Sequence, residues 1–117
     1  MLVRVDPSSS VPIYAQIAAS IRRAVAEGTL AEGDRLAPAR DLAEGLGVNL
    51  HTVLRGYQQL RDEGIVELRR GRGAVVTDRG ARTAGTYAAL AAYIDHARKA
   101  GLSTDEALAL VREGMES

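Results

Sequence analysis

The sequence predicts a mainly α-helical protein with one small β-hairpin, and three observations support this fold class. Apolar residues recur at helical spacing in several separate stretches of the chain. Glycines stand where most of these stretches end. Two short β-prone runs flank a glycine-containing turn within residues 65–77. We expect a first domain over residues 1–77, a linker over 78–86 and a two-helix tail over 87–117.

The composition is that of a folded protein. The 117 residues are 46% hydrophobic and 26% charged, which excludes a disordered or low-complexity chain. No cysteine is present, so disulfides, thiolate nucleophiles and zinc knuckles are excluded. No apolar run has the roughly 18–20 residues that cross a bilayer, and the N-terminus does not resemble a signal peptide. We therefore expect a cytoplasmic protein without a membrane partner.

The first predicted helix spans residues 12–27. Its apolar positions are four residues apart, and alanines fill the same face. Pro12 suits the first position of a helix, and Gly28 suits its end. These apolar positions are Ile13, Ile17, Ile21 and Val25. Residues 29–37 then predict a connecting turn, either alone or with a short extended piece.

The next two predicted helices, 38–45 and 49–63, have the spacing of a helix-turn-helix. Ala43 is small enough for close packing, Gly47 permits a positive φ in the turn, and Val53 faces the core. Asn49 suits the N-cap of the second of these helices. The spacing therefore predicts a helix-turn-helix over residues 38–63.

Helix 49–63 has two chemically different faces. Projection at 100° per residue places Leu50, Val53, Tyr57 and Leu60 on the core side. His51, Thr52, Arg55, Gln58 and Gln59 share the opposite side, with acids only at the far end. Donors of this kind suit base edges and phosphates, so we interpret this helix as a recognition helix for the DNA major groove. The alternative is an ordinary solvated face.

A hairpin follows, with strands predicted over residues 65–68 and 74–77. Its tip, residues 69–73, reads Arg-Arg-Gly-Arg-Gly. Residues 35–82 carry nine Arg against six acids, although the net charge of the whole chain is zero. A local basic patch suffices for phosphate contacts, and arginine suits a narrow minor groove. The tip is not followed by a predicted helix, which argues against a nucleotide-binding loop.

The tail combines a long helix from Tyr87 with a final helix that begins at the capping box Ser103–Glu106. The apolar stripe of this tail is long, and a chain of 117 residues cannot easily cover it alone. With only four aromatic residues and no Phe or Trp, the core of the chain is also expected to be thin. We expect the tail to form a homodimer. The expected dimerisation residues are Tyr87, Leu90, Ile94, Leu108 and Val111.

Other functions are less well supported by the residues. An enzyme needs a nucleophile, an acid–base pair or a metal site, and the chain has two widely separated histidines and no cysteine. His96 is either a metal or effector ligand or a surface or dimer-contact residue. A protein–protein interaction module remains an alternative, and it requires exposed apolar anchors on the recognition face. Single-stranded nucleic acid requires stacking aromatics, which the four tyrosines do not provide.

Residues 10–77 resemble the winged-helix transcription regulators of the GntR family. The similar segments are Pro-Ile-Tyr-Ala-Gln-Ile from Pro12, Leu-Ala-Pro-Ala-Arg-Asp-Leu-Ala from Leu36, residues 46–60, Glu-Gly-Ile-Val from Glu63 and Arg-Gly-Arg-Gly-Ala-Val-Val from Arg70. The family usually has an acidic residue where this chain has Ala39, whereas Arg40 is present. Leu50 and His51 stand where the short YtrA-like subfamily commonly has Pro and Asn.

The tail is similar to that of the short YtrA-like subfamily, which lacks the larger effector-binding domain. The resemblance implies a dimeric bacterial repressor of a nearby operon, often one that encodes a membrane transporter. It implies no cofactor and leaves a small-molecule effector open. The DNA contacts that it implies are Arg40, Asn49, His51, Thr52, Arg55, Arg70, Gly71, Arg72 and Gly73.

Overall fold

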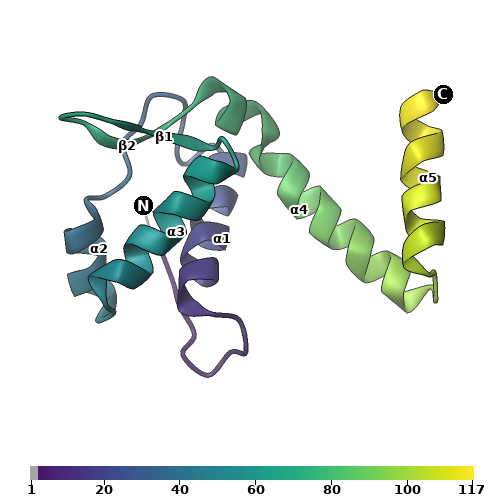
Figure 1. The fold of residues 1–117 in the computed structure, drawn as a ribbon, viewed down its shortest axis with the longest axis horizontal. Coiled ribbons are helices and arrows are strands. Elements are labelled where there is room, and N and C mark those ends of the chain that lie inside the picture. Colours follow the sequence, from purple (N-terminus) through teal and green to yellow (C-terminus); the bar gives the residue numbers. More distant parts are fainter. Residues whose placement is uncertain (1–2) are drawn as a thin grey trace. The chain divides into compact units, whose positions relative to one another are not determined.

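The computed structural model describes residues 3–117 and contains five helices and one hairpin in that part of the chain (Figure 1). The chain divides into two compact units, Met1–Gly85 and Thr86–Ser117. The elements are α1 (Ile13–Ala26), α2 (Ala39–Leu46), α3 (Leu50–Asp62), β1 (Val66–Arg69), β2 (Gly73–Val76), α4 (Asp78–Lys99) and α5 (Thr104–Glu116). The mainly helical fold with a winged helix-turn-helix is confirmed.

The core of the first unit lies where α1 packs on α3. Ile17 and Ile21 of α1 are fully buried, and so are Val53 and Leu60 of α3. Gly56 allows this close packing, because a Cβ there would lie 3.0 Å from the backbone oxygen of Tyr14. The backbones of the two helices therefore come into close contact at this position.

The turn between α2 and α3 has the predicted helix-turn-helix geometry. Gly47 has φ of 68° at the C-terminus of α2, a left-handed conformation that glycine adopts without strain. Ala43 and Val53 are both buried. The side chain of Asn49 accepts a hydrogen bond of 2.7 Å from the backbone N–H of His51 and so caps α3.

Tyr57 joins the start of α2 to α3. Its hydroxyl donates a hydrogen bond of 2.6 Å to the backbone oxygen of Ala37, just before α2. Burial raises the pKa of Tyr57 to about 12, because the phenolate would lose its hydration. This bond fixes the segment that leads into the first turn of α2.

The hairpin is antiparallel, with Val66 opposite Val76 and Arg69 opposite Gly73. The strands lie one residue from the predicted positions, β1 later and β2 earlier. Residues 33–36, within the segment predicted as a turn with a short extended piece, pair with the free edge of β2. The backbone N–H of Leu36 donates to the oxygen of Ala74 at 2.8 Å, within a segment that also bridges to Val75. The hairpin thus has a third, short backbone partner.

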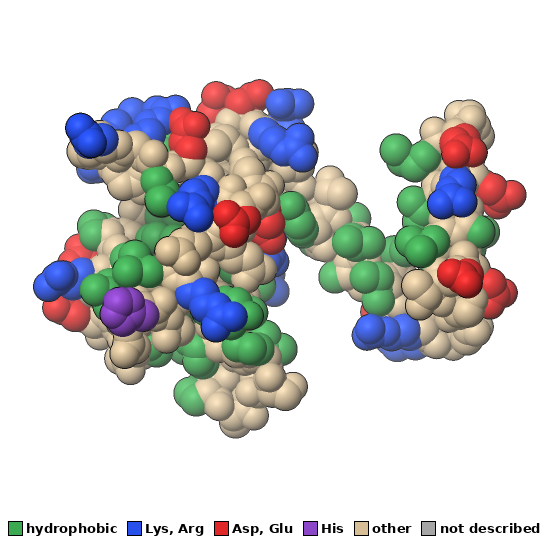
Figure 2. Space-filling model, viewed as in Figure 1, with side chains coloured by type: hydrophobic (Ala, Val, Ile, Leu, Met, Phe, Trp, Pro, Cys, Tyr) green, Lys and Arg blue, Asp and Glu red, His purple; other side chains and the backbone are tan. Residues whose placement is uncertain are grey.

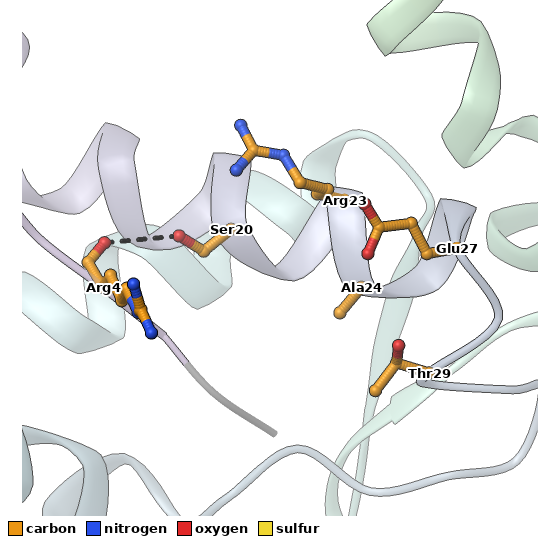
Figure 3. A pocket seen from close by; sticks show the side chains of 6 residues that line it. All are labelled: Arg4, Ser20, Arg23, Ala24, Glu27 and Thr29. Carbon is orange, nitrogen blue, oxygen red and sulfur yellow. Dashed lines mark hydrogen bonds between the residues drawn. The ribbon is translucent and has the colours of Figure 1, made fainter.

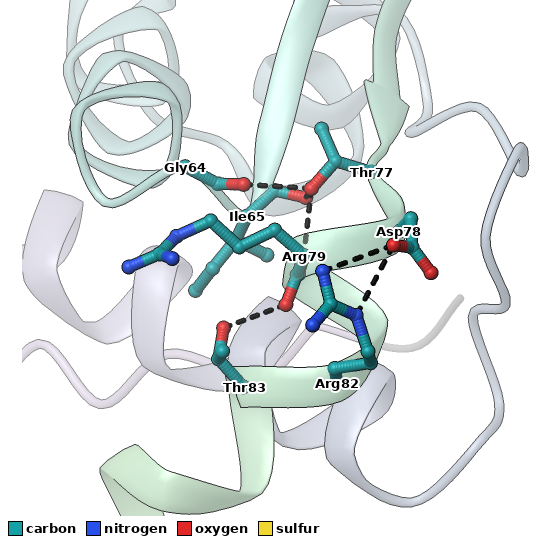
Figure 4. A network of polar contacts seen from close by, with 8 residues as sticks. Gly64, Ile65, Thr77, Asp78, Arg79, Arg82 and Thr83 are labelled. Atoms are coloured by element: carbon teal, nitrogen blue, oxygen red, sulfur yellow. Dashed lines mark hydrogen bonds and ion pairs between the residues drawn. The ribbon is translucent and has the colours of Figure 1, made fainter.

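Residues 78–86, predicted as a linker, are helical in the structure and form the first part of α4. The hydroxyl oxygen of Thr77 accepts a hydrogen bond of 2.8 Å from the N–H of Gly80 and donates one of 2.6 Å to the oxygen of Gly64 (Figure 4). Asp78 forms an i,i+4 ion pair of 3.0 Å with Arg82. The hydrogen bond from the N–H of Gly80 to the Thr77 hydroxyl caps the start of α4 and offsets the low helix propensity of its glycines.

In the second unit, residues of α4 up to Lys99 pack against α5. The hydroxyl of Tyr93 donates a hydrogen bond of 2.7 Å to the backbone oxygen of Ala107, and Ala97 is buried. The capping box at Ser103 and Glu106 is present as predicted. Hydrogen bonds from Ser103 hold the pKa of the Glu106 carboxyl below its usual value.

Gly80 provides a test of how α4 is attached to the first unit. A Cβ at this position would lie 2.3 Å from the backbone oxygen of Ile65, which other hydrogen bonds hold in place. We expect Gly80→Ala to lower the free energy of unfolding by about 1–3 kcal/mol, because the backbone has to shift. Urea denaturation followed by circular dichroism measures this change.

The matched control is Gly85→Ala in the same helix. Position 85 is exposed, and no atom lies within 4 Å of a Cβ built there. We expect this variant to be as stable as the parent or more stable by up to about 1 kcal/mol, because alanine favours helix. Equal effects of the two substitutions would contradict the close packing at Gly80.

Tyr57 predicts a fall in stability at alkaline pH. The phenol ionises near its ordinary pKa of 10 when unfolded, but only near pH 12 when folded. The unfolded state therefore loses this proton first, so the contribution of Tyr57 to stability is complete below pH 10 and is lost between pH 10 and 12. Urea denaturation at pH 8, 10 and 11 measures the loss.

In the same measurement, Tyr57→Phe should lower the free energy of unfolding at pH 8 by about 1 kcal/mol, because the bond to Ala37 is lost. It should also make the stability fall less steeply above pH 10. A variant with the same alkaline slope as the parent would contradict this role of Tyr57.

Candidate nucleic-acid interface

The polar face of α3 is open to solvent. His51 and Arg55 are exposed, and Thr52 is half-buried. The carbonyl oxygen of the Asn49 side chain is engaged in the cap of α3, so its NH₂ group is the part free to meet a ligand. The side chains that the sequence predicts on the polar face of α3 are therefore at the surface in its N-terminal half.

Arg55 has a partner that the sequence did not predict. Its guanidinium carbon lies 3.9 Å from the centre of the Tyr14 ring, in a cation–π stack between α3 and α1. The two residues are far apart in the sequence, and only the packing of α1 on α3 brings them together. No local pattern indicates such a pair.

The hairpin tip presents two arginines. Arg69 is ion-paired with Glu67 on the same strand. Within residues 3–117, neither Arg70 nor Arg72 has a hydrogen bond or ion pair through its side chain, and both are exposed. The face in Figure 2 shows Lys and Arg side chains gathered over the hairpin. The tip therefore has positive charge that local acids do not neutralise.

Two glycines shape the tip. Gly71 has φ of 79° and Gly73 has φ of 76°, and no atom lies within 4 Å of a Cβ at either position. The backbone N–H of Arg72 donates a hydrogen bond of 3.0 Å to the oxygen of Arg69, which closes the turn. The glycines are thus required by the backbone conformation, and they leave the tip open to close approach.

A depression connects α2, α3 and the hairpin. Arg72 lies on its wall, and so do Pro38 and Ala39 at the start of α2. Arg40 is exposed in the first turn of α2 and has no side-chain partner in the part of the chain that the structure describes. Sequence reasoning missed Leu54 and Leu68, which are 37% and 53% exposed and line this depression. The sequence does contain an indication of Leu54, because it is an apolar residue of α3 next to Arg55 on the polar face.

A second pocket lies at the C-terminal part of α1 (Figure 3). Arg23 and Glu27 on its wall have opposite charges, and the hydroxyl of Ser20 donates a hydrogen bond of 3.4 Å to the backbone oxygen of Arg4. This pocket has no buried polar group that would select a ligand.

The alternative of a metal site at His96 gains no support from its surroundings. His96 is exposed, and its neighbour Asp95 forms an ion pair of 3.0 Å with Lys99. Residues 3–117 contain no group of three or more His, Asp or Glu side chains placed to hold a metal ion.

None of the described helices is both long and apolar enough to cross a membrane.

Comparison with known proteins identifies the family. Residues 13–76 match the family of bacterial regulatory proteins, gntR family. The chain is 37% identical to the HTH-type transcriptional repressor YtrA of Bacillus subtilis over 82 residues, which cover 70% of this chain and 63% of that protein. The match thus spans less than two thirds of the Bacillus protein.

A longer match joins the chain to the HTH-type transcriptional regulator Rv1152 of Mycobacterium tuberculosis. The two are 35% identical over 106 residues, 91% of this chain and 88% of that protein. The solved structure of YtrA from Sulfolobus acidocaldarius, a GntR-family transcription factor, has a TM-score of 0.63 and 39% identity, over 78% of this chain and 99% of that one. These relatives are named as a transcriptional repressor, a transcriptional regulator and a transcription factor. The chain belongs to the GntR family of bacterial regulatory proteins and is a DNA-binding transcriptional regulator.

Proposed function

We propose that the protein reads a specific sequence in double-stranded DNA with α3 in the major groove. The observation that carries this proposal is the exposed donor face of α3, which has no acid in its N-terminal half. A major groove about 12 Å wide admits a helix and presents a distinct pattern for each base pair. His51, Thr52 and Arg55 are the side chains proposed to reach base edges, with the Asn49 amide beside them.

The hairpin tip and the start of α2 supply the contacts to the DNA backbone in this proposal. Arg70 and Arg72 have no acidic partner among residues 3–117, and Arg40 is exposed in the first turn of α2. Contacts of this kind fix the register of a protein on the duplex without reading sequence. Gly71 and Gly73 would let the backbone of the tip approach a phosphate or enter the minor groove.

We further propose that the second unit, Thr86–Ser117, forms a homodimer. Leu90, Ile94, Leu108 and Val111 are between 40% and 57% exposed and line one groove between α4 and α5, while Tyr87 is half-buried. An apolar groove of this kind supports burial against a second copy. Two recognition helices would then favour half-sites related by two-fold symmetry, about 34 Å apart or at a somewhat different spacing.

The regulatory outcome that we propose is repression of a nearby operon, of the transporter type that the subfamily resemblance implies. The similar Bacillus subtilis protein is called a repressor, which supports this direction.

A protein–protein interaction module is the second candidate. Leu54 and Leu68 favour it, because both are exposed beside the recognition face. Selection of bound duplexes from a random-sequence pool discriminates the two candidates. Enrichment of a two-fold motif supports operator binding, whereas a pool that stays random after repeated rounds contradicts it.

Arg72 and His51 test the division of labour between the hairpin and α3. We expect Arg72→Ala to weaken binding to the selected and a scrambled duplex alike, and to lower the slope of log affinity against log salt by about one. His51→Ala should instead reduce the discrimination between the two duplexes by about 1 kcal/mol, because one hydrogen bond to a base edge is lost. Fluorescence anisotropy at several salt concentrations measures both.

Arg23→Ala is the control for charge, because Arg23 is exposed on α1 beside the pocket of Figure 3 and lies outside the proposed interface. It should leave the salt slope and the discrimination unchanged. Equal losses on both duplexes for His51→Ala would show that this part of α3 does not read sequence.

The homodimer predicts an effect of charge on the apolar groove. Leu108→Glu combined with Val111→Glu should turn a dimer into a monomer in sedimentation equilibrium, because two carboxylates would be buried at the interface. Both positions are exposed, so the helix itself tolerates the change. Ala109→Glu, exposed on α5 and outside the groove, should remain dimeric. A monomeric parent protein would contradict the proposal directly.

A further inference from the structure

The starting point is the contact at which α1 and α3 come closest. A Cβ on Gly56 would lie 3.0 Å from the backbone oxygen of Tyr14 and 3.3 Å from Cγ2 of Ile17. This close packing brings the first turn of α1 against the middle of α3. The ring of Tyr14 therefore lies beside Arg55, the residue that precedes Gly56.

The guanidinium of Arg55 is held over this ring, with its carbon 3.9 Å from the ring centre. Stacking occupies one face of the planar group and leaves the N–H donors at its edge free. Across residues 3–117, Arg55 has no ion pair or hydrogen bond through its side chain, and it is exposed. The donors of a fixed guanidinium are thus available on the polar face of α3.

The arginines of the hairpin tip differ in this respect. Arg70 and Arg72 have no stacking partner among the described residues, so binding must order their side chains. Ordering a long, mobile side chain on binding costs conformational entropy, and a side chain that is already ordered in the free protein avoids most of this cost. Arg55 is in this sense the arginine that the fold has prepared before a ligand arrives.

We propose that Tyr14 is a positioning residue that aims the guanidinium of Arg55 at DNA. This inference rests on the proposed function and adds to it a residue of α1, outside the helix-turn-helix. Tyr14 acts through its ring face and not through its hydroxyl. Loss of the ring then weakens DNA binding only as long as residue 55 is arginine.

A double-mutant cycle in the full-length protein tests this coupling. The probe is the duplex that the parent protein selects from a random-sequence pool. Tyr14→Leu should weaken binding about two- to fivefold, the range for an exposed cation–π contact. Tyr14→Phe keeps the ring and should bind as the parent does. In an Arg55→Ala background, Tyr14→Leu should cause no further loss.

The free protein offers a spectroscopic readout that does not depend on DNA affinity. The Nε–H resonance of Arg55 should be shifted by the ring in the parent and in Tyr14→Phe, and should return to an ordinary position in Tyr14→Leu. Thermal unfolding of each variant reports its stability. Arg55→Lys, which keeps the charge without the planar group, approaches the coupling from the other side and should bind about as weakly as Tyr14→Leu.

Three outcomes would overturn the inference. They are an equal loss from Tyr14→Leu with and without Arg55, weaker binding by Tyr14→Phe, and binding by Arg55→Lys that equals that of the parent. The first two indicate a direct or purely structural role of Tyr14, and the third shows that charge alone is sufficient. In each case the parent still selects a duplex, so the proposed function stands. A parent protein that selects no duplex would overturn the function and the inference together.

Discussion

The first unit depends on the packing of α1 against α3 across Gly56. Because that residue has no side chain, the backbone of α1 at Tyr14 lies directly against α3, with Ile17 fully buried beside it. A larger residue would push the helices apart and open the core along its length. The same contact turns the outer surface of α3 toward solvent. Stability and the presentation of the polar face therefore have one physical origin, in a site that is itself buried.

The hairpin is attached to this core from three sides. Its β1 strand follows directly from the end of α3, its β2 edge pairs with residues 33–36, and Thr77 bonds back to the oxygen of Gly64. Only the tip extends beyond these attachments, and there the backbone N–H of Arg72 donates to the oxygen of Arg69 and closes the turn. A fixed base with a short free end suits a segment that has to meet a partner at a defined place.

Local patterns predicted what is local in this molecule. The helix-turn-helix follows from residues such as Gly47 and Asn49, whose roles in a turn and a cap depend on their immediate neighbours. Contacts between distant segments were not predictable in this way. The start of α4 was missed because its cap depends on Thr77 bonding across to Gly64, and glycines in 78–86 argued against a helix. The stack of Arg55 on Tyr14 likewise exists only in the folded chain.

The cap at Asn49 limits how this position can vary over evolution. Aspartate caps a helix at least as well as asparagine, and its negative charge is favourable at a helix N-terminus. An aspartate there would nevertheless place a carboxylate next to His51, at the end of α3 proposed to enter the negatively charged major groove of DNA. The cap alone would accept either residue, whereas the proposed binding to DNA favours the neutral one. The asparagine side chain thus caps α3 through its carbonyl oxygen and, in the proposed complex, adds no negative charge where DNA approaches.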